Sequence, residues 1–312
     1  MVAYVSRWAS AWVVLLSLVT SLAAPPVSAE EQGFVNESSF YPEGPLWHAG
    51  KLYYAEMSMD RIMVWDGKAN SVFWQGPECG PTTIARSMAG GFYIFCHMGN
   101  RIQEISALGF PVRTITRDMT GEPVGNPNES VSDSIGGVYF TSSGIFGPNA
   151  PPGGRVFYIT PGGEVRKVAS GIAYANGLAL TRAQDRLIVG AHLERKLLAY
   201  PVTSAGHLGP AQPFLDLNPV MDAPGRAAPW FLGPDGLLFD KDSNLYVCEY
   251  GGGRVLIFDR SLKLRKELKL GSLYVNAATF GATEQVLYVG AADSNSEGKL
   301  PGKVYEIRRP LE

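Results

Sequence analysis

One stretch of the sequence decides the fold: Gly233-Pro234-Asp235-Gly236-Leu237-Leu238-Phe239-Asp240-Lys241-Asp242-Ser243-Asn244-Leu245-Tyr246-Val247-Cys248-Glu249-Tyr250. It predicts a β-hairpin, because an apolar strand at 237–239 leads through a polar turn into a second strand at 245–249. An acid, Asp235, stands directly before the first strand. The same plan recurs along the chain, and an internal repeat outranks any local pattern when a fold is predicted.

Six segments follow this plan, at a period of about 40–60 residues, which is the range of four-stranded propeller blades. Most segments continue into a third strand that opens with a basic residue, as at 61–65 and 254–258. The sequence therefore predicts an all-β protein, a six-bladed β-propeller of four-stranded blades. We expect residues 30–41 to supply an outer strand that closes the ring, or to lie along it.

A polar residue precedes the first strand of each repeat. In chain order these residues are Glu43, Thr82, Asn128, Asn176, Asp235 and Asn276. Innermost propeller strands line the central channel, so these six residues, the polar ring, should converge at one mouth of the channel. The plain alternative for any single position is that Asn and Asp favour turns before strands.

The chemistry of the polar ring favours a hard divalent cation. Carboxylate and amide oxygens suit Ca²⁺, Mg²⁺ or Mn²⁺. The ring contains no His or Cys, so Zn²⁺ is the least favoured of the candidate ions.

The second strand of each hairpin should return to the same mouth, because it runs antiparallel to the first. Residues that end these strands are Glu56, His97, Ser142, His192, Glu249 and Asp293. His97 and His192 could be general bases or substrate contacts, or simply hydrogen-bonded histidines. A Gly- and Pro-rich loop at 142–154 could wall a pocket. Trp230 and Phe231 could add an apolar wall or pack their own loop down.

These features predict a set of substrate contacts at the channel mouth. The set is Thr82, His97, Asn128, His192, Trp230 and Asn276.

The N-terminal segment is typical of a secretory signal peptide. Arg7 precedes an apolar run at 8–24, and small residues lead to a cleavage site after Ala29. An uncleaved anchor helix is the alternative. We therefore expect a signal peptide at 1–29 and one propeller domain at 30–312, exported to the periplasm or secreted, with no membrane association after cleavage.

Charge and motifs exclude several classes of function. The chain has a net charge of −2 and no basic stripe, so no nucleic-acid partner is expected. It lacks a nucleophile elbow, a P-loop, a dinucleotide fingerprint and an HExxH pattern. Of its three cysteines, Cys79 and Cys96 flank one hairpin and could form a disulfide. Cys96 and Cys248 also occupy matching blade positions and could equally be core residues.

Four segments together resemble the signature segments of the regucalcin/gluconolactonase family, which shares its fold and metal site with diisopropyl-fluorophosphatase. They are Glu43-Gly44-Pro45-Leu46-Trp47, Pro127-Asn128-Glu129, Ala175-Asn176-Gly177-Leu178-Ala179-Leu180 and Pro234-Asp235-Gly236-Leu237. The resemblance implies a six-bladed propeller and a divalent metal, usually Ca²⁺. It implies Glu43, Asn176 and Asp235 as metal ligands, with Asn128 as a ligand or a substrate contact.

The chain also departs from that family pattern. Glu129 stands where Asp is usual, and the Arg-containing pattern expected of a sugar lactonase is absent. The departure argues against an aldonolactone substrate and leaves the metal site intact.

The resulting hypothesis is a metal-dependent hydrolase, a lactonase that opens a small-molecule lactone or related ester with activated water. The metal would polarise the carbonyl oxygen, and Asp235 is the predicted catalytic base. Two alternatives stay open: a phosphotriesterase-type hydrolase at the same metal, and a non-catalytic ligand-binding propeller with structural calcium. An activity of the strictosidine-synthase-like type is disfavoured, because a pocket without metal needs no ring of acids and amides.

Overall fold

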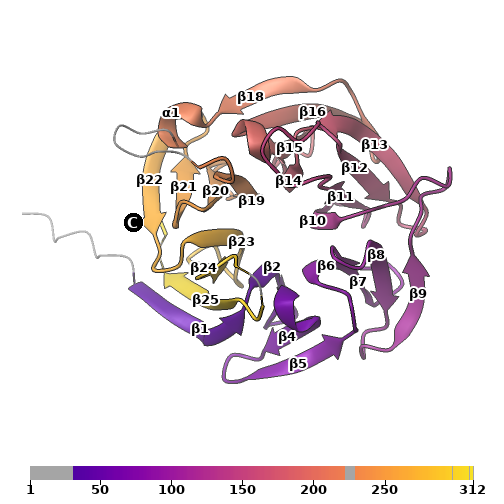
Figure 1. Ribbon diagram of the computed structural model, residues 1–312, viewed down its shortest axis with the longest axis horizontal. Helices are drawn as coiled ribbons and strands as arrows, with labels where there is room; N and C mark the ends of the chain where they lie inside the picture. Colours follow the sequence, from indigo (N-terminus) through magenta and orange to yellow (C-terminus); the bar gives the residue numbers. More distant parts are fainter. Residues whose placement is uncertain (1–30, 222–228, 297, 309, 312) are drawn as a thin grey trace, which may run out of the picture.

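The computed structural model describes residues 31–221, 229–296, 298–308 and 310–311. In this part of the chain, six sheets stand in a ring around a central channel (Figure 1). Each sheet has four principal strands in antiparallel order, and one sheet carries a short additional strand. The predicted six-bladed β-propeller of four-stranded blades is confirmed.

The first three blades are built from strands that follow one another in the chain. Blade 1 contains β2 (Pro42–His48), β3 (Lys51–Glu56), β4 (Arg61–Trp65) and β5 (Asn70–Gln75). Blade 2 contains β6 (Pro81–Arg86), β7 (Phe92–Cys96), β8 (Arg101–Ile105) and β9 (Pro111–Ile115). Blade 3 contains β10 (Pro127–Ser132), β11 (Val138–Ser142), β12 (Gly154–Ile159) and β13 (Val165–Ile172).

Blades 4 and 5 continue the pattern with one irregularity. Blade 4 contains β14 (Ala175–Leu180), β15 (Arg186–Ala191), β16 (Lys196–Ser204), the short β17 (His207–Leu208) and β18 (Gln212–Asp216). A single helical turn, α1 (Asn218–Met221), follows β18, and short 3₁₀ turns lie at Met57–Met59 and His192–Glu194. Blade 5 contains β19 (Gly233–Phe239), β20 (Leu245–Tyr250), β21 (Arg254–Phe258) and β22 (Leu264–Lys269).

The sixth blade joins the two ends of the propeller. Its inner strands are β23 (Tyr274–Phe280), β24 (Val286–Ala292) and β25 (Pro301–Arg308), and its outer strand is β1 (Glu31–Phe40). β1 pairs antiparallel with β25, from Glu31 opposite Arg308 to Phe40 opposite Pro301. Figure 1 shows the two strands side by side at the closure of the ring. The expectation that residues 30–41 supply a closing outer strand is confirmed over Glu31–Phe40.

The cores lie between neighbouring blades, because successive side chains of a strand point to opposite faces. In β20, Leu245 and Val247 pack in one cluster with residues of blade 4. Tyr246 and Cys248 point the other way and pack in a second cluster with residues of blade 6. A strand buried on both faces must be apolar almost throughout, which explains why the inner hairpins carry uninterrupted apolar runs.

The three cysteines divide between two roles. Cys79 and Cys96 form a disulfide that joins the link before β6 to the end of β7. Cys248 is free and buried in the core between blades 5 and 6. The predicted disulfide between Cys79 and Cys96 is therefore confirmed. The predicted role as a core residue is confirmed for Cys248.

The predicted signal peptide, 1–29, lies outside the described residues. Within the described ranges, no helix combines the length and the apolar character needed to cross a bilayer.

Candidate active site

Each inner strand has an irregular register at its polar-ring residue. The pairing with the second strand shifts between Glu43 and Leu46 in blade 1, and between Pro234 and Leu237 in blade 5. Corresponding shifts occur in the other four blades. A bulge bends a strand and re-aims its side chains. The bulges therefore help to turn the ring residues toward the channel mouth.

Glycine follows the polar residue in three blades and lets neighbouring inner strands touch through their backbones. A Cβ added at Gly177 would lie 1.9 Å from the carbonyl oxygen of Asp235. At Gly44 it would lie 2.3 Å from the carbonyl oxygen of Thr82, and at Gly236 it would lie 2.7 Å from Cα of Ala277. The Glu-Gly, Asn-Gly and Asp-Gly pairs of the sequence thus bring the ring residues close together.

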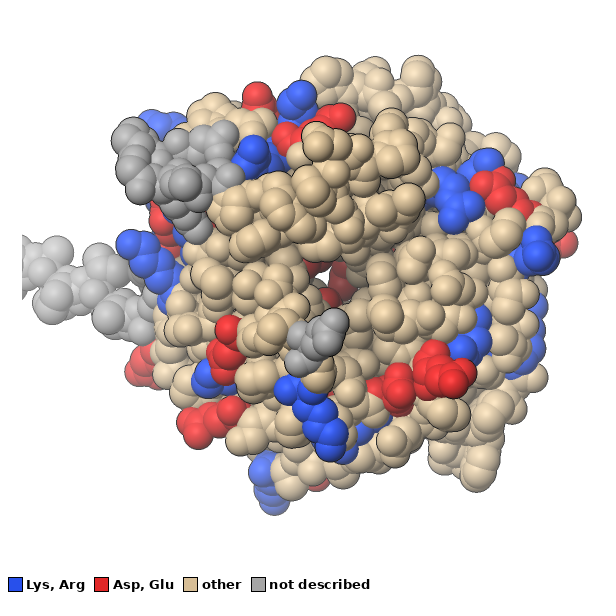
Figure 2. Space-filling view, in the orientation of Figure 1, with Lys and Arg blue, Asp and Glu red and all other residues tan. Residues whose placement is uncertain are grey.

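A cavity of about 230 Å³ opens at the channel mouth. Its described lining comprises Tyr41, Glu43, Met57, Thr82, His97, Asn128, Phe146, Tyr174, Asn176, His192, Asp235 and Tyr250. Figure 2 shows this hollow at the centre of one face, with Asp and Glu surface at its floor and most Lys and Arg toward the periphery. The structure therefore brings seven of the nine predicted site residues to one cavity.

Two predicted site residues do not line the cavity. Asn276 is fully buried, and its Nδ2 donates a hydrogen bond to the Pro42 carbonyl oxygen at 2.9 Å, which ties blade 6 to blade 1. Trp230 is 44% exposed, and its ring packs against Phe146 at a centroid distance of 4.9 Å. Trp230 therefore supports the wall of the cavity without lining it.

Carboxyl groups crowd the floor of the cavity. Burial raises the pKa of Glu43 well above its usual value, and the nearby charges of Asp235 and Glu129 raise it further. Burial likewise raises the pKa of Asp235, with Glu129 adding to the effect, and it raises the pKa of Glu129 to about 8. None of the described lining residues is Lys or Arg. The floor thus concentrates acidic groups, and no Lys or Arg of the described lining is there to balance their charge when they ionise.

Two amides stand beside these acids. Asn128 Nδ2 donates to Asn176 Oδ1 at 2.8 Å and to Ser143 Oγ at 2.9 Å. The Asn176 side chain also hydrogen-bonds Asp235, which acts to lower the pKa of that carboxyl. The Thr82 hydroxyl donates to the Asn128 backbone carbonyl oxygen at 2.9 Å and so helps to hold Asn128 in position. The ring residues of blades 2 to 5 therefore form one connected polar layer.

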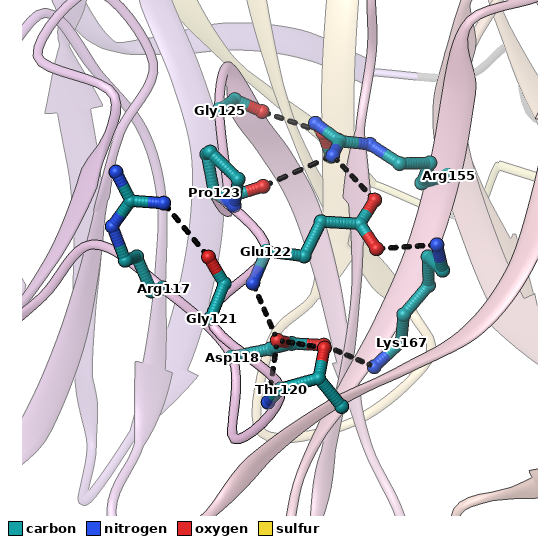
Figure 3. Close-up of polar contacts among 10 residues, drawn as sticks. Arg117, Asp118, Thr120, Gly121, Glu122, Pro123, Gly125, Arg155 and Lys167 are labelled. Carbon is teal, nitrogen blue, oxygen red and sulfur yellow. Dashed lines mark hydrogen bonds and ion pairs between the residues drawn. The ribbon is translucent and has the colours of Figure 1, made fainter.

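The link that delivers Asn128 to this layer is anchored by ion pairs (Figure 3). The Asp118 carboxylate accepts two hydrogen bonds from backbone N–H groups of its own link, each at 2.9 Å. Glu122 pairs with Arg155 at 3.0 Å and also with Lys167. Because Arg155 and Lys167 belong to blade 3, these pairs hold the link against the blade that it enters.

The two histidines at the mouth have different environments. Both ring nitrogens of His192 face backbone carbonyl oxygens, Nδ1 that of Pro234 at 3.0 Å and Nε2 that of Phe231 at 2.9 Å. Nδ1 of His97 is buried and has no hydrogen-bond partner among the described residues. Burial lowers the pKa of each imidazole to about 4, so both are neutral near pH 7. His192 is therefore held in the cavity wall by its contacts with the backbone. Nδ1 of His97 could instead accept a hydrogen bond from a bound molecule or donate one to it.

Three of the residues predicted alongside the histidines lie one position out of register with them. Glu56, Ser142 and Glu249 stand opposite arginines and bond to those side chains, so they do not line the cavity. The true counterparts of His97 and His192 are Met57 in blade 1 and Ser143 in blade 3. All four donate their backbone N–H to the residue two positions before a ring residue.

Sequence patterns did not single out the aromatic wall of the cavity. It consists of Tyr41, Phe146, Tyr174 and Tyr250. A signal for two of them was present, because Tyr41 and Tyr174 each stand two residues before a ring residue. Both have left-handed backbone, with φ of 52° and 57°, where the chain turns from one blade into the next. The 142–154 loop contributes Phe146, which bears out its expected place at the pocket.

The donor set at the floor fits a hard divalent cation. Glu43 Oε2 is a buried carboxylate oxygen without a hydrogen-bond partner in the described structure. No described group of three or more His, Cys, Asp or Glu side chains is arranged to hold a metal. A cation here would therefore depend on the amide oxygens of Asn128 and Asn176 beside Glu43 and Asp235, and an all-oxygen set of this kind suits Ca²⁺ or Mg²⁺.

Solved structures share this fold. A luciferin-regenerating enzyme superposes with a TM-score of 0.72 at 19% identity, covering 90% of this chain and 95% of that one. A gluconolactonase from Xanthomonas campestris gives 0.69 at 17% identity, covering 90% of both chains. A calcium-binding protein, regucalcin, from Agrobacterium tumefaciens gives 0.68 at 14% identity, covering 88% of this chain and 93% of that one. At these identities the likeness establishes the fold alone.

Sequence comparison adds a nearer relationship. Lactonase drp35 of Staphylococcus haemolyticus is 35% identical over 139 residues, which cover 43% of this chain and 38% of that protein. The matched part thus spans well under half the length of this relative. The model of the SMP-30/gluconolactonase/LRE-like region matches residues 41–293, from the start of blade 1 into blade 6. This protein therefore belongs to the SMP-30/gluconolactonase/LRE-like family.

Proposed function

We propose that this protein is a lactonase that hydrolyses a small-molecule lactone at the channel mouth with the help of a bound divalent cation, Ca²⁺ in the first place. One observation carries the proposal: buried carboxyl groups converge beneath an open cavity, and none of the described lining residues is Lys or Arg. Such a cluster is costly unless a cation balances it. The lactonase name of a related protein and the shared family support the type of reaction.

Glu43, Asn128, Asn176 and Asp235 would hold the cation. When bound, it would polarise the lactone carbonyl and stabilise the negative charge that develops on its oxygen. The carboxylate and amide groups of the floor would keep the cation at a fixed place, since Asn128 and Asn176 are already hydrogen-bonded to each other.

The reaction adds one water across the acyl carbon–oxygen bond of the lactone. The water oxygen bonds to the carbonyl carbon, the ring carbon–oxygen bond breaks, and the product is a hydroxy acid. Asp235 would take the proton of the attacking water and return it to the leaving ring oxygen, and its presence in the cavity lining supports this role. His97 is the second group that could accept this proton, through its unpartnered Nδ1.

Acid release by pH-stat from the purified protein tests the proposal. The panel holds aliphatic, aromatic and sugar lactones and one phosphotriester, assayed after chelation and again with Ca²⁺, Mg²⁺, Mn²⁺ or Zn²⁺ restored. We expect lactone turnover that disappears with chelator and returns with metal. Turnover of the phosphotriester alone would replace the lactonase assignment, and no turnover with any metal would favour a ligand-binding propeller.

Two variants locate the base. We expect Asp235→Asn to lower kcat by about 100-fold or more, which is the usual contribution of a general base. We expect His97→Gln to stay within about tenfold of the wild type. The exposed turn residue Asp66 offers the matched control, Asp66→Asn, which should leave kcat unchanged. Calorimetry with Ca²⁺ on each variant separates a lost base from a lost cation site, and the reverse order of the two effects would assign the base to His97.

A further inference from the structure

A groove lined by residues of blades 4 and 5 lies at the end of the propeller opposite the channel mouth. β19 carries Asp235 at its mouth end and Phe239, a residue of the groove, at its other end. The groove has a volume of about 320 Å³, within the range of about 300–1,000 Å³ that is typical of small-molecule sites. Its described lining, which we call the arginine groove, comprises Thr181, Arg182, Ala183, Asp185, Arg186, Phe214, Phe239, Ser243, Arg260 and Leu262.

Apolar side chains supply part of the arginine groove. Phe214 of β18 and Phe239 of β19 are partly buried and pack against the hydrophobic core between blades 4 and 5. Leu262, in the turn between β21 and β22, is also partly buried. Because the core supports the two rings, this apolar surface exists before any ligand binds. A hydrocarbon chain that covers it would gain about fourfold in affinity for each methylene removed from water.

Three arginines give the groove its positive charge. Arg182 and Arg186 come from blade 4, at the turn between β14 and β15, and Arg260 comes from blade 5, at the turn between β21 and β22. All three are exposed. Within the residues that the structure describes, neither Arg182 nor Arg260 has a hydrogen bond or an ion pair. These two guanidinium groups can therefore pair with an anion that enters the groove.

The acids near these arginines are engaged elsewhere. Asp185 is the only acid in the described lining, and its Oδ1 accepts a hydrogen bond from Thr181 Oγ1 at 2.6 Å. Its Oδ2 lies 3.9 Å from Arg186 Nε, which is too long for a hydrogen bond. Asp259, which precedes Arg260, does not line the groove, and its Oδ1 accepts backbone N–H groups of its own turn at 2.8 and 3.2 Å. The described lining thus carries three positive charges and one negative charge.

This combination favours a ligand with an anionic head and an apolar body. The planar guanidinium group of arginine matches the two oxygens of a carboxylate, and each such charged hydrogen bond is stronger than a neutral one. The aromatic rings and Leu262 would cover the apolar body. A neutral molecule would use the apolar part alone, and a cation would be repelled.

We propose that the arginine groove binds a small carboxylate with a single hydrocarbon tail, such as a medium-chain fatty acid. The carboxylate would pair with Arg182 and Arg260, and the tail would lie against Phe214, Phe239 and Leu262. The proposal is independent of the lactonase function, because the described lining of this groove shares no residue with that of the cavity at the channel mouth.

Calorimetric titration of the purified protein with octanoate, butanoate and octanol tests the proposal. We expect octanoate to bind at least about tenfold more tightly than butanoate, because more methylenes leave water. We also expect it to bind at least about tenfold more tightly than octanol, because only octanoate offers a charged acceptor to the arginines. The double variant Arg182→Gln, Arg260→Gln should lower the affinity for octanoate by about tenfold or more and leave that for octanol unchanged.

The matched control is Arg86→Gln. Arg86 is exposed at the end of β6 in blade 2, lies outside the described groove lining, and makes no hydrogen bond or ion pair within the described residues. This variant should bind octanoate as the wild type does. The substituted arginines are all exposed, so the variants should fold, and Tm values equal to that of the wild type would verify this.

Three results of the titration would overturn the proposal: no saturable binding of octanoate, equal affinity for octanoate and butanoate, or the same loss of affinity in Arg86→Gln as in the double variant. Co-sedimentation with phosphatidylglycerol vesicles distinguishes a free carboxylate from a lipid headgroup. Vesicle binding that requires Arg182 and Arg260, without binding of octanoate, would also overturn the proposal and assign the groove to an anionic membrane surface.

Discussion

Gly177 faces the backbone of Asp235 so closely that a Cβ at Gly177 would come within 1.9 Å of the Asp235 carbonyl oxygen. This contact joins the inner strands of blades 4 and 5, β14 and β19. It also brings the Asn176 side chain within hydrogen-bonding reach of the Asp235 carboxyl group. The position of the two ring residues therefore depends on the absence of a side chain between them.

Replacement of Gly177 by alanine should damage stability and activity together. A methyl group forced against backbone cannot be accommodated by a rotamer change, so we expect a loss of about 1–3 kcal/mol of unfolding free energy or more. We also expect kcat/KM for lactones to fall, because β14 and β19 must separate. The control is Gly162→Ala, whose added Cβ would have a Thr160 contact at an ordinary 3.7 Å. Equal stability of the two variants in urea unfolding would contradict the close contact.

The ion pair between Arg61 and Glu56 should contribute substantially to stability. Glu56 is fully buried, and Ser39 Oγ donates a hydrogen bond to it at 2.8 Å. Removing one partner of a buried pair typically costs about 3–5 kcal/mol, because the other charge stays buried. Arg61 is partly exposed, with its side chain at 22%, so we expect Arg61→Met to cost about 2–3 kcal/mol in denaturant unfolding.

The matching test is an ion pair at the surface. The Arg308 side chain is 59% exposed in its pair with Glu306. Exposed pairs contribute at most about 1 kcal/mol, so Arg308→Met should be nearly neutral. If both arginine variants unfold at the same denaturant concentration, burial of Glu56 does not make its ion pair more stabilising than an exposed one.

The disulfide between Cys79 and Cys96 should stabilise blade 2. It closes a loop with a sequence separation of 17 residues, and a loop of about that length corresponds to roughly 3 kcal/mol in the chain-entropy model. We expect the double variant Cys79→Ala, Cys96→Ala to lose roughly this amount, and we expect a reductant to lower Tm of the wild type. The same reductant should leave Tm of the double variant unchanged. An equal effect on both proteins would point to some other reducible group.

Export of the protein is expected from the N-terminal sequence. When the whole sequence is produced in a secreting bacterial host, we expect an exported product whose first residue is Glu30, read by N-terminal sequencing. A protein that still carries residues 1–29 and fractionates with the membrane would support the anchor alternative.

Much of the fold and of the site floor follows from sequence pattern, for identifiable physical reasons. The blades repeat along the chain, so one hairpin and the acid before it were enough to locate the other five hairpins and their polar residues. Glu43, Asn176 and Asp235 each precede a glycine, and the crowding at those glycines explains why the pairs recur. The inner strands all begin near one mouth of the channel, so residue order was enough to predict that most of the ring residues converge there, with Asn276 as the exception.

The wall of the cavity could not be predicted in the same way. Phe146 comes from a loop, so no period in the sequence locates it. Tyr250 follows the end predicted for its strand by one residue and pairs with Gly233, two positions before Asp235, so an error of one residue in register hid its place at the cavity. The placement of Asn276 and Trp230 depends on packing between blades, which a hairpin pattern does not contain. Register also mattered: a single residue separates Glu56, which pairs with an arginine, from Met57, which lines the cavity.

The most direct test of the divalent cation site is the effect of Ca²⁺ on thermal stability in the wild type and in Glu43→Gln. We expect Ca²⁺ to raise Tm of the wild type, because the cation binds only the folded acid-and-amide ring. We expect Glu43→Gln to lose this response, while its metal-free form gains about 1–2 kcal/mol of unfolding free energy by removal of a buried, unpartnered carboxyl oxygen. A wild-type Tm that Ca²⁺, Mg²⁺ and Mn²⁺ all leave unchanged would contradict the claim that the polar ring is a divalent cation site.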